Sequence, residues 1–418
     1  MHTVEIINYV IMCLFFICYS YQFLYIPLSW RPRKSSPGEG EEHRIAVLIA
    51  ARNEEQVIGK LIDSVRDQSY PSRLVSVFVV ADHCLDNTAA IARARGATVF
   101  ERRTGHGKGK GYALDYLLGE MRASHADDFD AYIVLDADNV LDRDFIRNID
   151  RTHSDGYDIV TCYRNSKNYG DSWISAGTGL WFLREARYLN AVRMRLGASC
   201  AISGTGFLFS RKILENYGGW SFFLLTEDIE FTIDNVIRGE KIGYCPDAVV
   251  YDEQPVAFRQ SWTQRLRWSR GYMQVFAKYG KRLISGIFHG SFSCYDMAMS
   301  IMPAAVLTAL SLAVNLGAAV ANFLVANQWA VLGASVLQTL VSLYLTIFAI
   351  GCITTMTEWR HIHCATWKKI GYVFTFPVFM LSFVPICIES LFVTPDWKPI
   401  IHNRVLDAKQ VCEGKEAV

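Results

Sequence analysis

Two acidic side chains stand two positions apart, directly after an apolar stretch. Asp136 and Asp138 belong to LDADN (residues 135–139), which follows AYIVL (131–135). In extended backbone, positions i and i+2 point the same way, so the two carboxylates repel unless a cation lies between them. Hard oxygen ligands suit Mg²⁺ or Mn²⁺ shared with substrate phosphates. The pair predicts a metal and phosphate site, and a solvated acidic turn is the alternative.

A second acidic pair precedes a predicted helix. Glu227 and Asp228 lie in LLTEDIE (224–230), just before FTIDNVIRG (231–239). Carboxylates at a helix start are favoured by the helix dipole, which is one interpretation. The other is a general base, a role that typically contributes about 10²–10⁴-fold in rate. The motif alone leaves both open.

Two further stretches have residues suited to a nucleotide. Asp82, in VVADHCLDNT (79–88), ends an apolar run, where its carboxylate can accept hydrogen bonds from a base or ribose. Asp86 in the same stretch is typical of a helix cap. GHGKGKGYAL (105–114) is glycine-rich and cationic but lacks the spacing of a Walker loop. It brings Lys110 to a nucleotide, or it is only a mobile loop.

QRLRWSRGY (264–272) is cationic and aromatic, and no Asp or Glu occurs between Gln254 and Tyr295. We expect it to meet an anion, either a diphosphate or the phosphates of a bilayer. An amphipathic helix on a membrane surface fits the second case. Its predicted apolar face has Trp262, Leu266, Met273 and Phe276. The residues expected to meet lipid phosphates are Arg259, Arg270 and Lys278.

Apolar, β-rich runs alternate with helical patterns through the middle of the chain. The predicted strands are 44–51, 75–81, 97–101 and 131–135. The predicted helices are 54–68, 87–96 and 111–121. This alternation indicates an α/β fold with a parallel sheet covered on both faces. Ligands in such sheets bind beyond the carboxyl ends of the strands, where Asp82 and Asp136 fall.

Four apolar stretches are long enough to cross a bilayer, which takes about 20 residues. They are 4–28, 296–326, 329–356 and 370–393. The first lacks the flanks of a cleaved signal peptide and predicts an anchor. The positions of Lys and Arg predict an N-terminus outside, a cytosolic middle and a multi-pass plasma-membrane protein. The fourth stretch contains two prolines, and we favour a re-entrant path that leaves the tail on the cytosolic side.

Overall composition excludes little, but it argues against nucleic acid. The chain has 42 Lys and Arg against 41 Asp and Glu, so there is no basic surplus. The 11 cysteines have no CxxC spacing and are typical of a reducing compartment.

In order, the motifs resemble those of the membrane-embedded family 2 glycosyltransferases, the group that contains cellulose, chitin, hyaluronan and poly-N-acetylglucosamine synthases. The resemblance rests on AARNEE (50–55), Asp82, GKGYAL (109–114), DAD (136–138), SGTGF (203–207), TED (226–228) and QRLRW (264–268). It spans residues 45 to about 275 and the general layout of the membrane segments. Asp82 is followed by His and Cys, where many members of the family have Asp-Gly.

The resemblance implies a GT-A (Rossmann-like) catalytic domain and inverting transfer from a UDP-sugar, with UDP-glucose or UDP-N-acetylglucosamine expected. Asp228, next to Glu227, would be the catalytic base, and Asp136 and Asp138 would engage Mg²⁺ or Mn²⁺. Arg267 would lie near the diphosphate and Trp268 near the acceptor sugar. The implied nucleotide-binding residues are Asn53, Glu54, Asp82, Lys110 and Asp136. The implied positioning residues are Ser203, Gly204, Thr205, Gly206, Phe207, Gln264, Arg267 and Trp268.

The expected organisation has six parts. They are a membrane helix (1–30), a linker (31–43), the GT-A domain (44–255), interface helices (256–294), membrane helices (295–393) and a tail (394–418). The favoured function is a processive synthase that extends and translocates a β-linked glycan. The alternative is a transferase that adds one sugar to a membrane lipid. A scaffold with a decayed catalytic domain is disfavoured, because every expected polar position is present.

Overall fold

A computed structural model gives the fold. It describes residues 2–30, 40–105, 107–301, 307, 310–311, 313–318, 320–321, 329–395, 402 and 404–413. Within the apolar stretch predicted at 296–326, residues 302–306, 308–309, 312, 319 and 322–326 lie outside the described residues.

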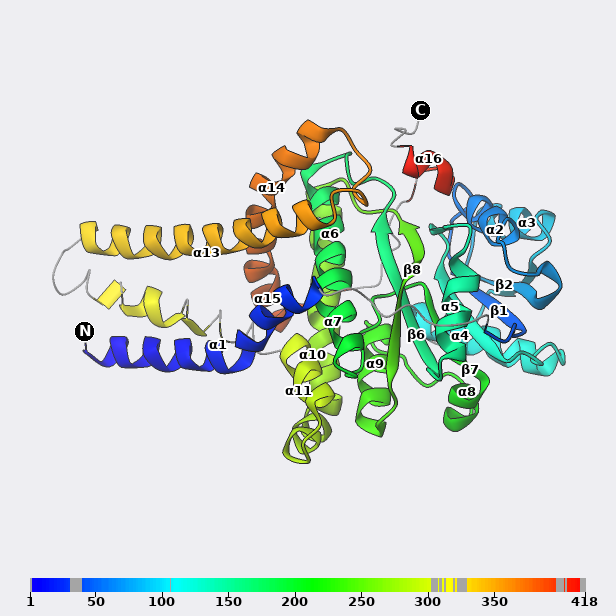
Figure 1. Cartoon of the computed structure of the whole chain (residues 1–418), viewed down its shortest axis with the longest axis horizontal. Helices are drawn as coiled ribbons and strands as arrows, with labels where there is room; N and C mark the ends of the chain where they lie inside the picture. The colour runs from blue at the N-terminus through cyan, green and yellow to red at the C-terminus, as the bar shows by residue number, and fades with distance from the viewer. Residues whose placement is uncertain are drawn as a thin grey trace.

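The chain alternates strands and helices before its C-terminal helices (Figure 1). The strands are β1 (Ile45–Ala51), β2 (Val75–Asp82), β3 (Thr98–Arg102), β4 (Ala131–Asp136), β5 (Val140–Leu141), β6 (Ile159–Ser166), β7 (Phe207–Ser210) and β8 (Ile242–Asp252). The helices before the last strand are α1 (His2–Ser29), α2 (Ile58–Arg66), α3 (Thr88–Ala94), α4 (Lys110–Ala123), α5 (Phe145–Ser154), α6 (Trp173–Arg184), α7 (Ala191–Arg195), α8 (Arg211–Tyr217) and α9 (Glu227–Arg238). Two short helical segments, η1 (Ser72–Leu74) and η2 (Glu185–Asn190), lie among them. The later helices are α10 (Phe258–Phe288), α11 (Phe292–Ile301), α13 (Trp329–Thr357), α14 (Thr366–Leu381), α15 (Phe383–Phe392) and α16 (Ala408–Cys412).

The strands form one mixed sheet in the order β3-β2-β1-β4-β7-β6-β8-β5. The pairs β1–β2, β2–β3, β1–β4 and β6–β8 are parallel, whereas β7 runs antiparallel to both β4 and β6. Six strands therefore point the same way, and their carboxyl ends share one edge. The four predicted strands are confirmed as β1 to β4, but β7 and β5 make the sheet mixed where the sequence predicted a parallel one.

Helices cover both faces of the sheet, as the alternation predicted. One hydrophobic core joins the odd-numbered positions of β1 to α2 and α5, and the other joins the even-numbered positions to α4, α6 and α9. A strand that is buried on both faces needs apolar residues at every position, which explains the unbroken sequence IAVLIAA of β1.

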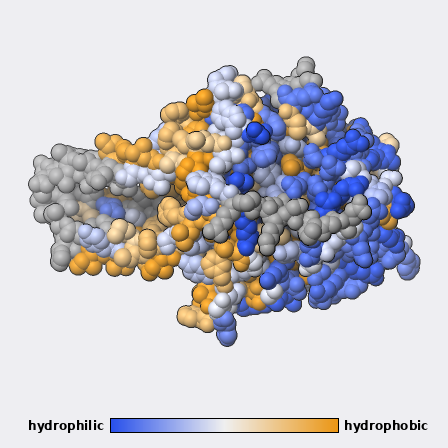
Figure 2. All heavy atoms as spheres, in the orientation of Figure 1, coloured by the Kyte–Doolittle hydropathy of each residue, from blue (hydrophilic) through white to orange (hydrophobic). Residues whose placement is uncertain are grey.

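Three described helices are long and apolar enough to cross a membrane: Tyr9–Ser29, Leu340–Thr357 and Thr366–Phe392. Figure 1 shows α1 and α13 extending away from the sheet on the same side. Hydrophobic residues gather over these helices, and hydrophilic residues cover the sheet domain (Figure 2). The chain is a membrane protein.

The last apolar segment is not one helix. α14 ends at Leu381 and α15 begins at Phe383, two residues before Pro385. Proline has no N–H for the carbonyl four residues earlier, and its ring crowds that carbonyl, so the helix breaks here. α14 packs on α13 and α6, while α15 packs on α10.

The break is held by Arg265, a buried residue of α10. Its Nη1 donates to the carbonyl of Phe379 at 3.1 Å and to Ser382 Oγ at 2.6 Å. Its guanidinium also lies 4.4 Å from the ring centroid of Phe379 and 4.8 Å from that of Phe383. The cation thus binds polar groups at the turn between two apolar helices.

Arg265→Ala should destabilise the protein, because it removes both bonds and leaves a buried carbonyl with fewer donors. Hydrogen bonds to charged groups contribute about 1.5–3 kcal/mol each. We expect the Arg265→Ala variant to unfold at a lower temperature than wild type in detergent, with unfolding measured by tryptophan fluorescence. Arg259→Ala, an exposed arginine on the same helix, is the matched control. Equal unfolding temperatures for the two variants would contradict this role for Arg265.

Candidate active site

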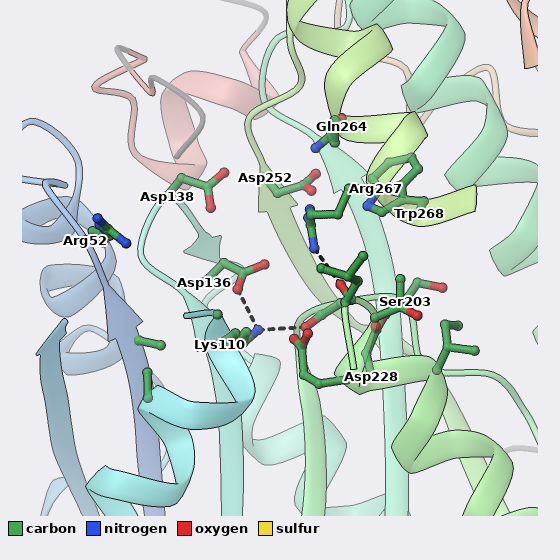
Figure 3. A pocket seen from close by; sticks show the side chains of 18 of the residues that line it. Arg52, Lys110, Asp136, Asp138, Ser203, Asp228, Asp252, Gln264, Arg267 and Trp268 are labelled. Atoms are coloured by element: carbon green, nitrogen blue, oxygen red, sulfur yellow. Dashed lines mark hydrogen bonds and ion pairs between the residues drawn. The ribbon is translucent and has the colours of Figure 1, made fainter. Parts of the chain in front are cut away.

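A cavity of about 410 Å³ opens at the carboxyl edge of the sheet (Figure 3). Asp82 and Asp136 end the parallel strands β2 and β4, which lie on either side of β1, and Arg52 and Glu54 follow β1. Helices α4, α9 and α10 supply the opposite wall, so residues separated by more than 200 positions line one space. Ligand sites commonly have volumes of about 300–1,000 Å³, so a nucleotide-sized molecule fits.

Lys110 and Asp136 form an ion pair on the floor of the cavity. Lys110 begins α4, and its Nζ lies 2.5 Å from Asp136 Oδ1 and 2.8 Å from the carbonyl of Gly204. The backbone N–H of Asp136 donates to Asn139 Oδ1 and to Thr205 Oγ1. Lys110 therefore joins the predicted acidic pair to the SGTGF segment.

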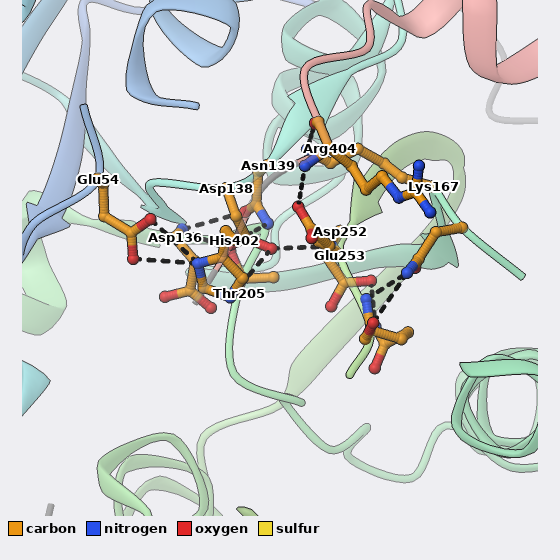
Figure 4. A network of polar contacts seen from close by, with 12 residues as sticks. Glu54, Asp136, Asp138, Asn139, Lys167, Thr205, Asp252, Glu253, His402 and Arg404 are labelled. Carbon is orange, nitrogen blue, oxygen red and sulfur yellow. Dashed lines mark hydrogen bonds and ion pairs between the residues drawn. The ribbon is translucent and has the colours of Figure 1, made fainter. Parts of the chain in front are cut away.

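Asp138 faces a different set of partners (Figure 4). It is buried, and its Oδ2 accepts the backbone N–H of Glu253 at 2.8 Å. His402, in the C-terminal segment, places Nε2 4.0 Å from the same oxygen and Nδ1 3.0 Å from both carboxylate oxygens of Glu54. Burial disfavours both charges, but His402 and Lys167 hold the pKa of Asp138 below its usual value, and the surrounding carboxylates raise the pKa of His402 to about 10.

The donor set fits a divalent cation that completes its coordination with phosphates. Among the residues that the structure describes, no three His, Cys, Asp or Glu side chains form a ready-made metal centre. Mg²⁺ keeps few protein ligands and takes the rest from water and substrate phosphates. Two carboxylates at a strand end match that pattern.

The segment before α9 is fixed between two helices. A side chain at Gly111 of α4 would lie 2.1 Å from the carbonyl of Phe222, and one at Gly271 of α10 would lie 2.5 Å from Thr226. These contacts leave no room for a Cβ, so glycine is required at both positions. The close packing sets where α9 begins and therefore where Glu227 and Asp228 point.

Both acids of TED line the cavity at the start of α9. Burial, with Asp228 beside it, raises the pKa of Glu227 to about 7. Burial also raises the pKa of Asp228, although backbone hydrogen bonding, Lys110 and Arg267 oppose the shift. A carboxylate that is partly desolvated is a stronger base than one in water, so Asp228 can accept a proton from a hydroxyl in the cavity.

One side of α10 faces the cavity with Gln264, Arg267 and Trp268, which share a helical face because they are three and four positions apart. Arg267 Nη1 donates to the carbonyl of Leu225 at 2.8 Å, which holds the guanidinium above the TED segment. The Trp268 ring meets Phe182 of α6 edge to face, with centroids 6.1 Å apart.

The residues of SGTGF (203–207) divide between the cavity wall and the buried core behind it. Ser203 and Gly204 border the cavity, whereas Phe207 lies in the core against Phe209 and Phe231. Thr205 is buried and supports Asp136 from behind. A side chain at Gly206 would lie 2.3 Å from Cys162, so this glycine permits close packing and does not touch the cavity.

The two remaining predicted nucleotide contacts also differ in placement. Asp82 reaches the cavity, where Arg102 Nη1 at 2.6 Å and His83 Nδ1 at 2.8 Å bind its carboxylate. Asn53 is outside the cavity lining and accepts the backbone N–H of Leu85, so it shapes the loop after β2.

Residues that the motifs did not single out complete the wall. Arg164 of β6 binds Asp252 at 2.6 Å and the Ser203 carbonyl at 2.6 Å, and its guanidinium lies over the Phe182 ring. Glu185, in the π-helical turn η2, accepts from Ser203 Oγ at 2.5 Å. Asp252 could have been found as an acid at a strand end, but Glu185 and His402 carry no local signal.

Two cations of α10 that were expected to meet lipid phosphates have protein partners. Lys278 Nζ lies 2.6 Å from Glu230 Oε1, and Arg270 Nη1 donates to the carbonyl of Ser390. Trp262 Nε1 likewise donates to Glu389 of α15 at 2.7 Å. Arg270 and Trp262 are therefore bound to α15, and Lys278 is bound to α9.

The sequence of the chain is similar to those of known glycosyltransferases. Residues 43–271 match the family described as "Glycosyltransferase like family 2". A probable glycosyltransferase, YdaM of Bacillus subtilis, is 26% identical over 276 residues, covering 60% of this chain and 62% of the relative. The beta-monoglucosyldiacylglycerol synthase of Synechocystis is 26% identical, covering 56% and 49%, and the poly-beta-1,6-N-acetyl-D-glucosamine synthase of Staphylococcus epidermidis is 26% identical, covering 56% and 56%.

A solved structure has the same fold. The mannosyltransferase PcManGT of Pyrobaculum calidifontis, in complex with GDP-Man and Mn²⁺, superimposes with a TM-score of 0.63 at 18% identity, over 93% of this chain and 99% of that one. The chain spans about half to three-fifths of the length of the curated relatives named above. The family match covers more than half of the 418 residues, and the fold is the GT-A fold predicted from the sequence. The chain belongs to glycosyltransferase family 2.

Proposed function

We propose that the protein transfers a hexose, with inversion, from a UDP-sugar to an acceptor hydroxyl at the membrane surface. One observation carries the proposal: a single cavity brings the Asp136–Asp138 pair, the Asp228 carboxylate and the Arg267 guanidinium together. These are groups for holding a diphosphate, removing a proton and stabilising a leaving group. The family and the GT-A fold support the same reaction class.

The donor would lie along the carboxyl edge of the sheet. Asp82 is placed to accept hydrogen bonds from uridine, and Lys110 and Asp136 lie farther along the same edge. A divalent cation, Mg²⁺ or Mn²⁺, bound with Asp138 would neutralise the diphosphate and polarise its bond to the sugar.

Asp228 would take the proton of the acceptor hydroxyl as that oxygen forms a bond to C1 of the sugar. The bond from C1 to the diphosphate oxygen breaks on the opposite face, so UDP leaves with the bonding electrons and the configuration inverts. Negative charge then grows on the leaving oxygen, where Arg267 can donate two parallel hydrogen bonds. The proton remains on Asp228 until solvent takes it.

The first candidate acceptor is the end of a growing β-linked glycan. Trp181, Phe182 and Trp268 place aromatic rings at one end of the cavity, and flat apolar rings suit a pyranose. Similarity to a poly-beta-1,6-N-acetyl-D-glucosamine synthase supports this choice.

A membrane lipid is the second candidate. The Trp181 ring lies 6.2 Å from that of Phe383, which begins α15 in an apolar segment long enough to span a bilayer. The acceptor end of the cavity is thus next to the membrane helices, and three relatives are named beta-monoglucosyldiacylglycerol synthases.

For topology, we propose a cytosolic catalytic domain with the N-terminus outside. The segment at 404–413 packs against the catalytic sheet through Tyr251, Leu406 and Val411. The tail and the active site therefore share one side of the membrane. A tail on the same side as the active site favours the re-entrant path for α14 and α15. A cytosolic active site would also have access to UDP-sugars, which are cytosolic.

The purified protein in lipid nanodiscs should release UDP from one member of a panel of UDP-sugars and should release no GDP from GDP-mannose. Mass spectrometry then gives the mass of the product. A ladder of added hexoses indicates glycan elongation, and a single addition indicates a lipid acceptor.

Asp228→Asn should lose about 10²–10⁴-fold in turnover while UDP affinity by calorimetry stays unchanged, because Asn has the same shape but is not basic. Turnover near wild type would exclude Asp228 as the base.

Chelation should stop transfer. Excess EDTA removes the cation that shields the diphosphate from Asp136 and Asp138, so we expect no detectable product until Mg²⁺ or Mn²⁺ is restored. Full turnover in EDTA would contradict a metal-dependent mechanism.

Arg267→Ala should reduce kcat more than it weakens UDP-sugar binding. The negative charge that Arg267 would stabilise develops on the leaving diphosphate oxygen only as the bond to C1 breaks. Loss of one hydrogen-bond donor to such a developing charge typically lowers kcat by about 10²–10³-fold. Arg259→Ala, exposed on the same helix, is the control, compared by initial rates over a range of donor concentrations. A rise in KM with unchanged kcat would show that Arg267 binds the ground state and the transition state equally.

A further inference from the structure

We infer that Glu185 and Tyr272 bind neighbouring hydroxyls of the acceptor, so that the acceptor is the sugar end of a glycan and not a lipid with one hydroxyl. The inference rests on the proposed transfer to an acceptor hydroxyl, and it names the class of that acceptor. Figure 3 shows Ser203, Asp228 and Trp268 on one side of the cavity. Glu185 and Tyr272 line the same cavity.

Glu185 has one carboxylate oxygen bound to the protein and one that is available. Ser203 Oγ donates to Oε1 at 2.5 Å. Among the residues that the structure describes, none donates a hydrogen bond to Oε2, and the side chain borders the cavity. Burial raises the pKa of Glu185 above its usual value, although Ser203 and nearby arginines oppose the shift. A carboxylate withdrawn from water needs donors, and an acceptor hydroxyl would supply one.

Tyr272 offers a hydroxyl to the same space. It lies four positions after Trp268, so both residues are on the face of α10 that borders the cavity. Within the described part of the chain, its hydroxyl has no hydrogen-bond partner and can both donate to a ligand and accept from it. Burial raises the pKa of Tyr272, and the charges of Glu185 and Asp228 raise it further. The hydroxyl is therefore within electrostatic range of both carboxylates.

The proposed base is connected to this pair through the SGTGF segment. A side chain at Gly204 would place its Cβ 3.3 Å from Arg164 Nη1 and 4.0 Å from Asp228 Oδ2. The same Arg164 atom donates to the carbonyl of Ser203 at 2.6 Å, and Ser203 in turn binds Glu185. Asp228 and Glu185 thus lie beside two consecutive residues. An acceptor with one hydroxyl at Asp228 can reach Glu185 with a neighbouring one.

The backbone that carries Glu185 is irregular and firmly held. This residue begins the π-helical turn η2, and such turns occur frequently at functional sites. The Asn190 side chain exchanges two hydrogen bonds of 2.9 Å with the backbone of Ala201. The hydroxyls of Tyr188 and Thr357, which ends α13, are 2.7 Å apart. The turn is thus fixed at two points, which keeps Glu185 at the cavity wall.

An acceptor with a single hydroxyl leaves these groups unsatisfied. Diacylglycerol would give its one hydroxyl to Asp228 and displace water from Glu185 and Tyr272 without replacing the lost hydrogen bonds. A terminal sugar presents further hydroxyls beside the attacking one, and its apolar face suits the Trp268 ring. Sites built to bind a substrate hydroxyl reject a ligand that lacks it by up to about 10⁴–10⁵-fold.

The test uses the full-length protein in nanodiscs, with the UDP-sugar that supports UDP release and β-linked tetramers of glucose or N-acetylglucosamine as acceptors. Glu185→Ala should raise the acceptor KM by about 10–100-fold, because it removes a hydrogen bond to a charged group. Tyr272→Phe, which removes only the hydroxyl, should raise it by about 2–10-fold. UDP affinity, and UDP release to water without acceptor, should match wild type in both variants.

Two further variants and a lipid acceptor complete the test. Glu185→Gln keeps the volume and the bond from Ser203, so the acceptor KM should rise by less than in Glu185→Ala. Glu215→Gln, an exposed glutamate on α8, should match wild type in every measurement. Dioleoylglycerol in the nanodiscs should give no glycosylated product with the wild-type protein.

The outcomes separate this inference from the proposed function. An unchanged acceptor KM in Glu185→Ala, or transfer to dioleoylglycerol at rates that neither Glu185→Ala nor Tyr272→Phe alters, would overturn the inference and leave the proposed transfer intact. Loss of UDP affinity in Glu185→Ala would also overturn it, by showing that this residue only supports the fold. If wild type releases UDP from no UDP-sugar, the proposed function fails, and this inference fails with it.

Discussion

Repulsion among buried carboxylates is the constraint on which the active site depends. The parallel strands bring Asp82, Asp136 and Asp252 to one edge of the sheet, with Asp138 just beyond. Acidic groups that are close together and withdrawn from water cannot all stay ionised without positive partners. The chain meets this requirement with one cation for each acid: Arg102 for Asp82, Lys110 for Asp136, Arg164 for Asp252 and His402 for Asp138.

Those cations come from four separate parts of the chain, so folding and site assembly are one process. Arg102 ends β3, Lys110 begins α4, Arg164 lies on β6 and His402 follows the membrane helices. None of these residues is near its partner in sequence. The ion pairs therefore form only when the sheet is complete and the tail has returned to it.

Much of the fold could be predicted from the sequence, because β1 to β4 are continuous apolar runs separated by helices of clear period. The two antiparallel strands, β7 and β5, could not. β7 has four residues and β5 has two, too short for any pattern, and they make the sheet mixed. For the site, local motifs gave the acids at strand ends and the stripe of Gln264, Arg267 and Trp268. His402 and Glu185 have no motif, because only tertiary structure brings them to the cavity.

α10 shows why a cationic segment can serve more than one purpose. Its three arginines in QRLRWSRGY were expected to share a diphosphate or a bilayer, yet each has a different direction. Arg267 faces the cavity, Arg265 is buried at the α14–α15 break, and Arg270 reaches the Ser390 carbonyl. A helix places residues two positions apart on nearly opposite sides, so Arg265 and Arg267 cannot serve one ligand. The same helix thus holds the broken membrane segment with one side and presents Arg267 to the cavity with the other. α10 is therefore the element that links α15 to the cavity face where Arg267 lies.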